Sequence, residues 1–179
     1  MSGYNVAVVG ATGLVGETII SILEERNFPI ETIVPLASAD SAGMEVTFYQ
    51  EQYPVKELQS FDFKGMGFCF FSAGASVSSE FVPIATEQGA IVIDNTSCFR
   101  YDNDVPLVVP EVNPDALVMY TKRNIIANPN CSTIQLVVAL APIHKIARIK
   151  RINVATYQSV SGAGRQLVEL LNQQVDASL

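Results

Sequence analysis

The segment "NPNCST" places Cys131 among small polar residues, directly before the apolar stretch "IQLVVAL". This pattern predicts a helix that begins at the cysteine. Backbone N–H groups at a helix N-terminus stabilise a thiolate and can donate to an oxyanion formed on a substrate carbonyl. Asn128, Asn130 and Ser132 add polar side chains around the thiol. The segment therefore indicates a nucleophile, with a small buried cysteine at a helix start as the common alternative.

A cysteine nucleophile is usually paired with a base, and the sequence contains one histidine, His144. Along a continuous helix, thirteen residues separate it from Cys131 by ~20 Å. A bend at Pro142 would leave most of that distance in place. We therefore expect His144 to be a surface residue near a helix C-terminus and not the base.

A second candidate site is the glycine turn "VVGATGLVG", in which Gly10, Gly13 and Gly16 follow a predicted strand and open a predicted helix. Glycines permit the turn and let backbone N–H groups approach a pyrophosphate at the positive end of the helix. A glycine turn without a ligand is the alternative, but the strand and helix around it favour dinucleotide binding. Ser38 is the last residue of the second predicted strand, where a small residue leaves room for the phosphate of NADP.

The elements that must position these residues alternate between strand and helix. Short apolar runs predict buried strands, and the glycine turn and a serine-rich segment open the predicted helices. The strands are expected over 4–9, 30–38, 67–74, 90–97 and 124–129, and a helix over 76–89 that Pro83 could shorten. This alternation predicts a Rossmann-like, doubly wound, mostly parallel sheet. Right-handed crossovers then bring the loops after the strands to one edge.

The pattern changes after Ile149. Residues 149–164 predict one long strand, with Ile152, Val154 and Thr156 on one face, and 165–174 predict a helix. One strand and one helix cannot form an independent domain. The sequence therefore predicts a dinucleotide-binding domain over 1–130, and over 131–179 the start of an incomplete α+β catalytic and dimerisation domain.

Composition narrows the class of function. The net charge of −7 argues against nucleic acid and anionic membranes as partners. No apolar run approaches the ~20 residues that a membrane span requires, and no signal-type segment opens the chain, so a cytoplasmic protein is expected. Cys69, Cys98 and Cys131 lack the spacing of a disulfide framework or a metal site, and Cys69 reads as core packing. Small-molecule chemistry is the expected activity.

Seven blocks taken together resemble one family of enzymes. In order they are "VAVVGATGLVG", "LASADSAG", "FSAGASVS", "DNTSCFR", "VPLVVPEVN", "NPNCSTIQLVVAL" and "TYQSVSGAG". They resemble bacterial aspartate-semialdehyde dehydrogenase over essentially the whole chain. The resemblance implies an NADPH-dependent, two-domain homodimer that converts aspartyl 4-phosphate to aspartate 4-semialdehyde.

The resemblance also implies roles for individual residues. Cys131 matches the nucleophile that forms an acyl-thioester, Gln158 a residue that orients the substrate, and Asn130 a residue beside the carbonyl. Arg100 matches a phosphate-binding arginine, and a guanidinium suits a phosphoryl leaving group. The implied NADP(H) contacts are Gly10, Thr12, Gly13, Leu14, Val15, Ser38, Asp40, Ser41, Ser72, Ala73, Gly74, Ser161 and Gly162.

The sequence departs from the family pattern in two respects. Asp40 stands where the family commonly has an arginine, and a carboxylate there would repel the NADP phosphate and weaken the preference for NADP. The family's acid/base histidine, a substrate-binding arginine and a lysine belong to a segment after Leu179, so this chain alone is expected to be inactive.

Three other interpretations remain open at the level of sequence. One is an N-acetyl-glutamyl-phosphate reductase, which shares the fold and chemistry, although "NPNCSTIQL" and "TYQSVSGAG" favour the aspartyl enzyme. The others are a nucleotide-binding module with an inert cysteine, and a purely structural truncation product.

Overall fold

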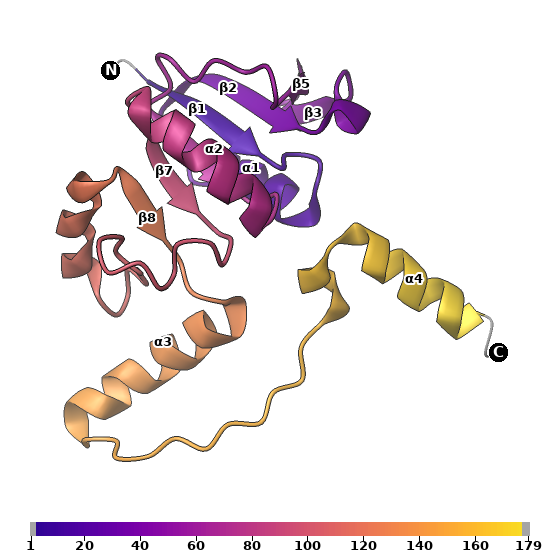
Figure 1. Cartoon of the computed structure of the whole chain (residues 1–179). Helices are drawn as coiled ribbons and strands as arrows, with labels where there is room; N and C mark the ends of the chain where they lie inside the picture. The colour runs from indigo at the N-terminus through magenta and orange to yellow at the C-terminus, as the bar shows by residue number, and fades with distance from the viewer. Residues whose placement is uncertain (1–2, 177–179) are drawn as a thin grey trace. The chain divides into compact units, whose positions relative to one another are not determined.

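A computed structural model describes residues 3–176 of the chain. Its contacts divide the chain into two compact units, Met1–Asn130 and Cys131–Leu179 (Figure 1). The first unit contains a six-stranded sheet with the order β5-β2-β1-β6-β7-β8, and every pairing in it is parallel. The predicted Rossmann-like parallel sheet is therefore confirmed.

The strands of this sheet are short and follow the predicted apolar runs. They are β1 (Tyr4–Val9), β2 (Ile30–Ala37), β5 (Lys56–Glu57), β6 (Phe68–Phe71), β7 (Ile91–Asp94) and β8 (Ile125–Ala127). A separate antiparallel hairpin, β3 (Glu45–Phe48) with β4 (Glu51–Pro54), was not predicted, and neither was β5.

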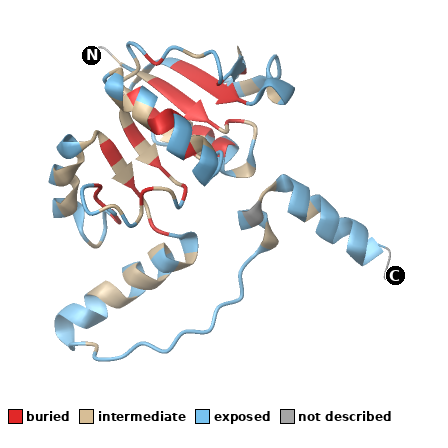
Figure 2. Cartoon of the chain, viewed as in Figure 1, coloured by how far each residue is buried: buried red, intermediate tan, exposed pale blue. Residues whose placement is uncertain are grey.

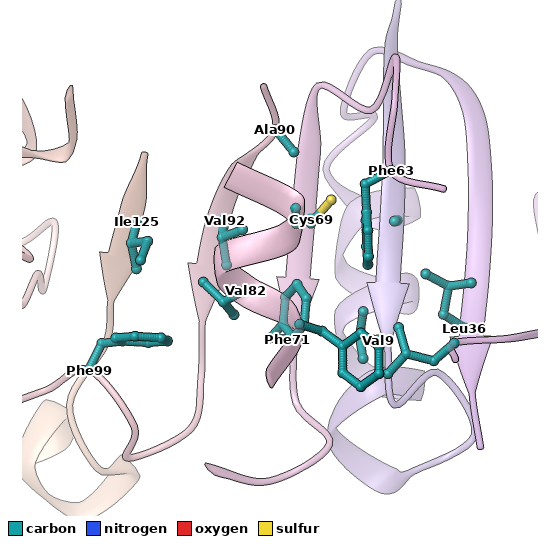
Figure 3. Packing of buried hydrophobic residues seen from close by; sticks show 14 of the residues in the cluster. Val9, Leu36, Phe63, Cys69, Phe71, Val82, Ala90, Val92, Phe99 and Ile125 are labelled. Atoms are coloured by element: carbon teal, nitrogen blue, oxygen red, sulfur yellow. The ribbon is translucent and has the colours of Figure 1, made fainter. Parts of the chain in front are cut away.

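Two helices cover the two faces of the sheet. On β1, Val6 and Val8 belong to a core with residues of α1 (Leu14–Glu25), whereas the alternate residues Ala7 and Val9 belong to a core with residues of α2 (Ala75–Glu87). This alternation follows from the two-residue period of a strand. Figure 3 shows the second core, where Val82 packs among Cys69, Phe71 and Val92. Figure 2 shows the buried residues concentrated in these strands and the helices against them.

Pro83 lies inside α2 and does not shorten it. The helix continues to Glu87 although a proline in its interior lacks one backbone donor. Phe81, Val82 and Ala85 are buried on the sheet on both sides of the proline, so tertiary packing holds the helix together there. Gly89, at φ +95°, follows the helix in the left-handed conformation expected of a terminating glycine.

The second unit contains α3 (Cys131–Ile146) and α4 (Arg165–Asp176), with 147–159 between α3 and a short 3₁₀ helix, η3 (Val160–Ala163). Two more 3₁₀ helices, η1 (Ala39–Ser41) and η2 (Pro114–Lys122), belong to the first unit. From 131 to 176, no residue whose side chain is described is buried. Across residues 3–176, no helix combines the length and apolar character needed to cross a membrane.

The prediction of a long strand over 149–164 is wrong. Residues 147–159 follow an irregular path, 150–159 are all exposed, and the described chain offers them no strand partner. The alternation of apolar residues predicts which face of a strand would be buried, but a strand also needs a neighbour to complete its ladder of hydrogen bonds. The helix predicted after it is confirmed as α4.

The close approach of α1 to the turn before it gives a test of the fold. A Cβ added at Gly16 would overlap the carbonyl oxygen of Gly10 and the backbone of Ala11. We expect Gly16→Ala to lower the free energy of unfolding by about 1–3 kcal/mol, because the helix must shift away from the turn. Urea denaturation measures this loss.

Gly162→Ala is the matched control, since an added Cβ there meets no atom within 4 Å. Its unfolding midpoint should stay close to that of the unmodified chain. Equal midpoints for the two variants would show that the turn and α1 are not packed as described.

Candidate functional site

The loops after β1 and β6 lie side by side at the carboxyl edge of the sheet. All strands of this sheet are parallel, but the order in which they are added reverses here, since β2 and β5 extend the sheet on one side of β1 and β7 and β8 extend it on the other side of β6. Ligands of doubly wound folds bind at such a switch point. Gly10 has φ +84°, and a Cβ on it would meet Ser72 Oγ at 3.0 Å and Ala73 N at 3.1 Å. The N–H and the hydroxyl of Ser72 both donate to the carbonyl of Val9, at 3.0 Å each. Only glycine fits at position 10.

Both helices that start at this edge have N-termini without a side-chain cap. Gly13 is the N-cap of α1 and Gly74, at φ +101°, is the N-cap of α2, and neither residue has a side chain to accept the first N–H groups. Uncapped N–H groups together with the helix dipole attract anions. A serine or an aspartate at either N-cap would accept hydrogen bonds from these N–H groups through its own side chain. Glycine leaves the N–H groups available to a ligand.

The loop after β2 reaches the glycine turn. Thr12 Oγ1 donates to Ser41 Oγ at 3.4 Å, which brings η1 next to the residues after β1. Ser38 is exposed as the N-cap of η1, and Asp40 is exposed within it. The predicted polar residues of these loops are therefore neighbours, and the only charge among them is the carboxylate of Asp40.

Arg100 is half-buried in the loop after β7 and is held by neutral acceptors. Its Nε donates to the carbonyl of Asn128 at 2.9 Å and its Nη2 donates to the carbonyl of Asn95 at 3.1 Å. Among the described residues, no carboxylate forms an ion pair with it. A guanidinium has five N–H donors, so these two bonds leave most of them for a ligand. The arrangement suits an anion such as phosphate.

The loop that carries Arg100 is fixed to α2 by a buried carboxylate. Asp94 is 0% exposed and accepts hydrogen bonds from the hydroxyl of Ser78 at 2.9 Å, the N–H of Thr96 at 3.1 Å and the hydroxyl of Thr96 at 2.9 Å. Thr96 Oγ1 in turn accepts from the N–H of Cys98. These bonds satisfy the buried charge and define the turn that leads to Arg100.

Arg123 holds the other side of the same loop. It donates to Asp102 at 2.8 Å and to Asp104 at 3.2 Å, and its guanidinium lies 5.2 Å from the ring centre of Phe99. Partial burial alone would lower the pKa of Arg123, but the hydrogen bonds to Asp102 and Asp104 outweigh it and raise the pKa. Nothing in the sequence pattern singled out Arg123, whereas Asn95 could have been found because it lies in the block "DNTSCFR" near the end of the strand predicted over 90–97.

Cys131 is the exposed first residue of α3, as predicted. Gln158 lies beside the first turn of this helix, where its Nε2 donates to Ser132 Oγ at 3.4 Å. His144 is exposed in the last turn of the same helix, and its Nδ1 accepts from the N–H of Ile149. The structure thus brings Gln158 to the cysteine end of α3 and leaves His144 at the opposite end. Ser161 bonds locally to Ser159 before α4.

The three thiols differ in environment, and no disulfide joins them. Cys69 is fully buried in the core, which confirms its packing role, and this burial raises the pKa of its thiol to about 12. Cys98 is half-buried, and its pKa is raised by burial first and then by the charges of Asp94 and Asp102. No cluster of three or more metal-ligating side chains occurs within residues 3–176.

Family models match most of the chain. The model of the semialdehyde dehydrogenase NAD binding domain matches residues 5–120, and the model of the semialdehyde dehydrogenase dimerisation domain matches residues 140–179. Aspartate-semialdehyde dehydrogenase from Shewanella sp. strain DB6705 is 58% identical over 171 residues, which are 96% of this chain and 51% of that protein. The counterpart from Bacillus subtilis is 51% identical over 99% of this chain and 51% of its own length. The chain spans about half the length of these relatives.

Solved structures agree with these matches. A structure of aspartate semialdehyde dehydrogenase II from Vibrio cholerae, complexed with ASA, has a TM-score of 0.95 at 51% identity and covers 97% of this chain and 52% of that one. An aspartate semialdehyde dehydrogenase from Candida albicans, solved with NADP, has a TM-score of 0.66 at 27% identity and covers 83% of this chain and 48% of that one.

The different environments of the thiols predict an order of alkylation. In the native chain, iodoacetamide should modify exposed Cys131 first, Cys98 more slowly and Cys69 only after unfolding. Because the pKa of Cys98 is raised, its thiolate fraction and its rate should keep increasing at pH values above the ordinary cysteine range. Peptide mass spectrometry over a pH series measures the three rates separately. Modification of Cys98 as fast as Cys131 at neutral pH would contradict this assignment of environments.

Proposed function

Because the chain belongs to the semialdehyde dehydrogenase family, we propose that it supplies the cofactor-binding and nucleophile half of an aspartate-semialdehyde dehydrogenase. The proposed reaction is the NADPH-dependent conversion of aspartyl 4-phosphate to aspartate 4-semialdehyde and phosphate. The observation that carries the proposal is Cys131 at the N-terminus of α3 with Gln158 against the first turn of that helix.

The two units take different roles in this proposal. Met1–Asn130, which contains the parallel sheet, is the dinucleotide-binding domain. Cys131–Leu179 is the beginning of the catalytic and dimerisation domain, and the lack of buried side chains among its described residues fits a unit whose apolar residues are covered in an assembled protein. We propose a cytoplasmic homodimer that acts on a small molecule.

The residues at the switch point fit NADP(H). The positive φ of Gly10 and the two uncapped helix N-termini provide a backbone cradle for the pyrophosphate, and Thr12, Ser38 and Ser41 offer hydroxyls. When bound, NADPH supplies the hydride that reduces the substrate. The proposed contacts are Gly10, Thr12, Gly13, Leu14, Val15, Ser38, Asp40, Ser41, Ser72, Ala73, Gly74, Ser161 and Gly162.

The side chains of this chain then act on the acyl phosphate. The Cys131 thiolate attacks the acyl carbon, a C–S bond forms, and the C–O bond breaks as phosphate leaves with its electron pair. Arg100 binds the phosphate through the N–H groups that its two carbonyl partners leave available. Gln158 and Asn130 orient the carbonyl. After reduction at the acyl carbon, the C–S bond breaks, aldehyde is released and the thiolate of Cys131 is restored.

This cycle requires a proton, and His144 is too far from Cys131 to supply it. His144 lies at the far end of α3 from Cys131, about 20 Å along the helix. We propose that the acid/base group, together with the group that binds the substrate carboxylate, comes from the half of the protein that the relatives have and this chain does not span.

A chimera tests the proposed function. Residues 1–179 joined in register to the remaining half of the Shewanella relative should oxidise aspartate semialdehyde in the presence of phosphate and NADP. Cys131→Ala should abolish that turnover and leave the NADP dissociation constant unchanged, because the thiol acts in the chemistry and not in nucleotide binding.

The 179-residue chain alone is the comparison for this chimera, and it should show no turnover, because acid–base catalysis is typically worth ~10²–10⁴-fold. Turnover by the Cys131→Ala chimera at near the normal rate would remove Cys131 from the mechanism. An inert chimera that still binds NADP would favour a nucleotide-binding module.

The carboxylate of Asp40 leads us to expect only a weak preference for NADP over NAD. Its exposed carboxylate lies in η1 next to the glycine turn, where it opposes the extra phosphate of NADP. Asp40→Arg should raise NADP affinity about tenfold or more and change NAD affinity little. Fluorescence titration of both nucleotides measures the ratio, and Asp62→Arg is a control for added charge in an exposed loop. An unchanged NADP dissociation constant for Asp40→Arg would show that Asp40 is not near the phosphate.

A further inference from the structure

We propose that Asn128 is a positioning residue that fixes the guanidinium of Arg100 through a side-chain bridge to Asn95. The inference rests on the proposed function, in which Arg100 binds phosphate, and it assigns a role to the contact between two residues that the sequence analysis did not connect. Asn128 Nδ2 donates to Asn95 Oδ1 at 2.8 Å, across the loops that follow β7 and β8. The backbone carbonyls of the same two asparagines are the acceptors of Arg100.

The bridge therefore joins the two residues that hold the arginine. A guanidinium is planar and its donors have a fixed spacing, so two carbonyls hold it in one orientation only if their own separation is fixed. The loops come from neighbouring strands, β7 and β8, and the N–H of Asn128 also donates to the carbonyl of Asp94 at 3.2 Å. With the amide bridge added, the two loops are joined through both backbone and side chain beside Arg100.

A second observation is that the side chain of Asn128 carries a feature that lowers the stability of the fold. Its Oδ1 is buried and accepts no hydrogen bond within the described chain. A buried acceptor without a partner is destabilising, and replacement of both amides by apolar groups would be close to neutral. A small apolar side chain at position 128 would remove the buried unpaired oxygen, but it would also remove the hydrogen bond to Asn95. We infer that position 128 holds an amide because its N–H₂ group is needed.

Arg100 has no carboxylate partner among the residues that the structure describes, which explains why such a bridge matters. An arginine paired with an aspartate is held by charge, whereas the two hydrogen bonds of Arg100, at 2.9 and 3.1 Å, are to neutral carbonyls. Neutral acceptors keep the positive charge available for an anion but orient the side chain less strongly than a carboxylate would. Because the bridge fixes the positions of the two carbonyls, they can orient the guanidinium as an ion pair otherwise would.

The test compares Asn128→Ala, Asn95→Ala and the double variant in the 179-residue chain. The readout is the hydrogen-exchange rate of the Arg100 Nε–H in ¹⁵N NMR spectra, assigned by its loss in Arg100→Lys. Loss of one net hydrogen bond should accelerate this exchange about fivefold to tenfold. The double variant should match the single variants, since all three remove the same bridge.

The matched control is Asn5→Ala, which removes an asparagine hydrogen bond of similar length to the carbonyl of Gly65, away from the loops after β7 and β8. It should leave Arg100 exchange unchanged. The urea midpoints of the bridge variants should stay near that of the unmodified chain. Unchanged Arg100 exchange in Asn128→Ala, or faster exchange that only follows a lower midpoint, would overturn the positioning role.

Titration with inorganic phosphate separates this inference from the proposed function. The Arg100 resonances should shift on addition of phosphate, and the bridge variants should bind it about fivefold more weakly. If phosphate leaves the Arg100 resonances of the unmodified chain in place, the phosphate role of Arg100 is wrong. The exchange measurement would still decide whether Asn128 positions the guanidinium.

Discussion

Burial of β1 on both faces is the constraint on which the rest of the first unit depends. Its residues from Val6 to Val9 are all 0% exposed, so each face of the strand must be covered by a separate layer. Helices α1 and α2 provide these layers, and their crossovers send the loops after β1, β2, β6 and β7 to one edge of the sheet. The glycines that allow α1 to approach the turn follow from the same requirement. The packing of the two helices on the sheet thereby brings the polar residues of these loops together at its carboxyl edge.

The site at that edge is organised to leave charge and backbone donors available. Two helix N-termini lack side-chain caps, and Arg100 is held by carbonyls instead of a carboxylate. Two carboxylates near Arg100 are otherwise engaged, since Asp94 accepts from hydroxyls and an N–H, and Asp102 pairs with Arg123. The ion pair between Arg123 and Asp102 holds the loop in place, while Arg100 forms no such pair and keeps its charge for an anion.

The sequence predicted those parts of the fold that local patterns determine. Apolar runs located the buried strands, and the segment around Cys131 located the start of α3. The strand predicted over 149–164 failed because pairing depends on a neighbour, and Pro83 did not end α2 because packing around Phe81 and Val82 holds it. The contacts of Arg123 and the bridge between Asn95 and Asn128 join residues distant in the chain, so no local pattern could reveal them.

The central claim is that the carboxyl edge of the parallel sheet binds the dinucleotide. Hydrogen-exchange mass spectrometry of the 179-residue chain with and without NADP tests it directly. We expect slower exchange in peptides that contain the loops after β1, β2 and β6, which span residues 10–13, 38–41 and 72–74. We expect no change in the loops that precede β2 and β7 at the opposite edge, around Asn27 and Gly89. Protection at that opposite edge, or none in the three loops at saturating NADP, would contradict it.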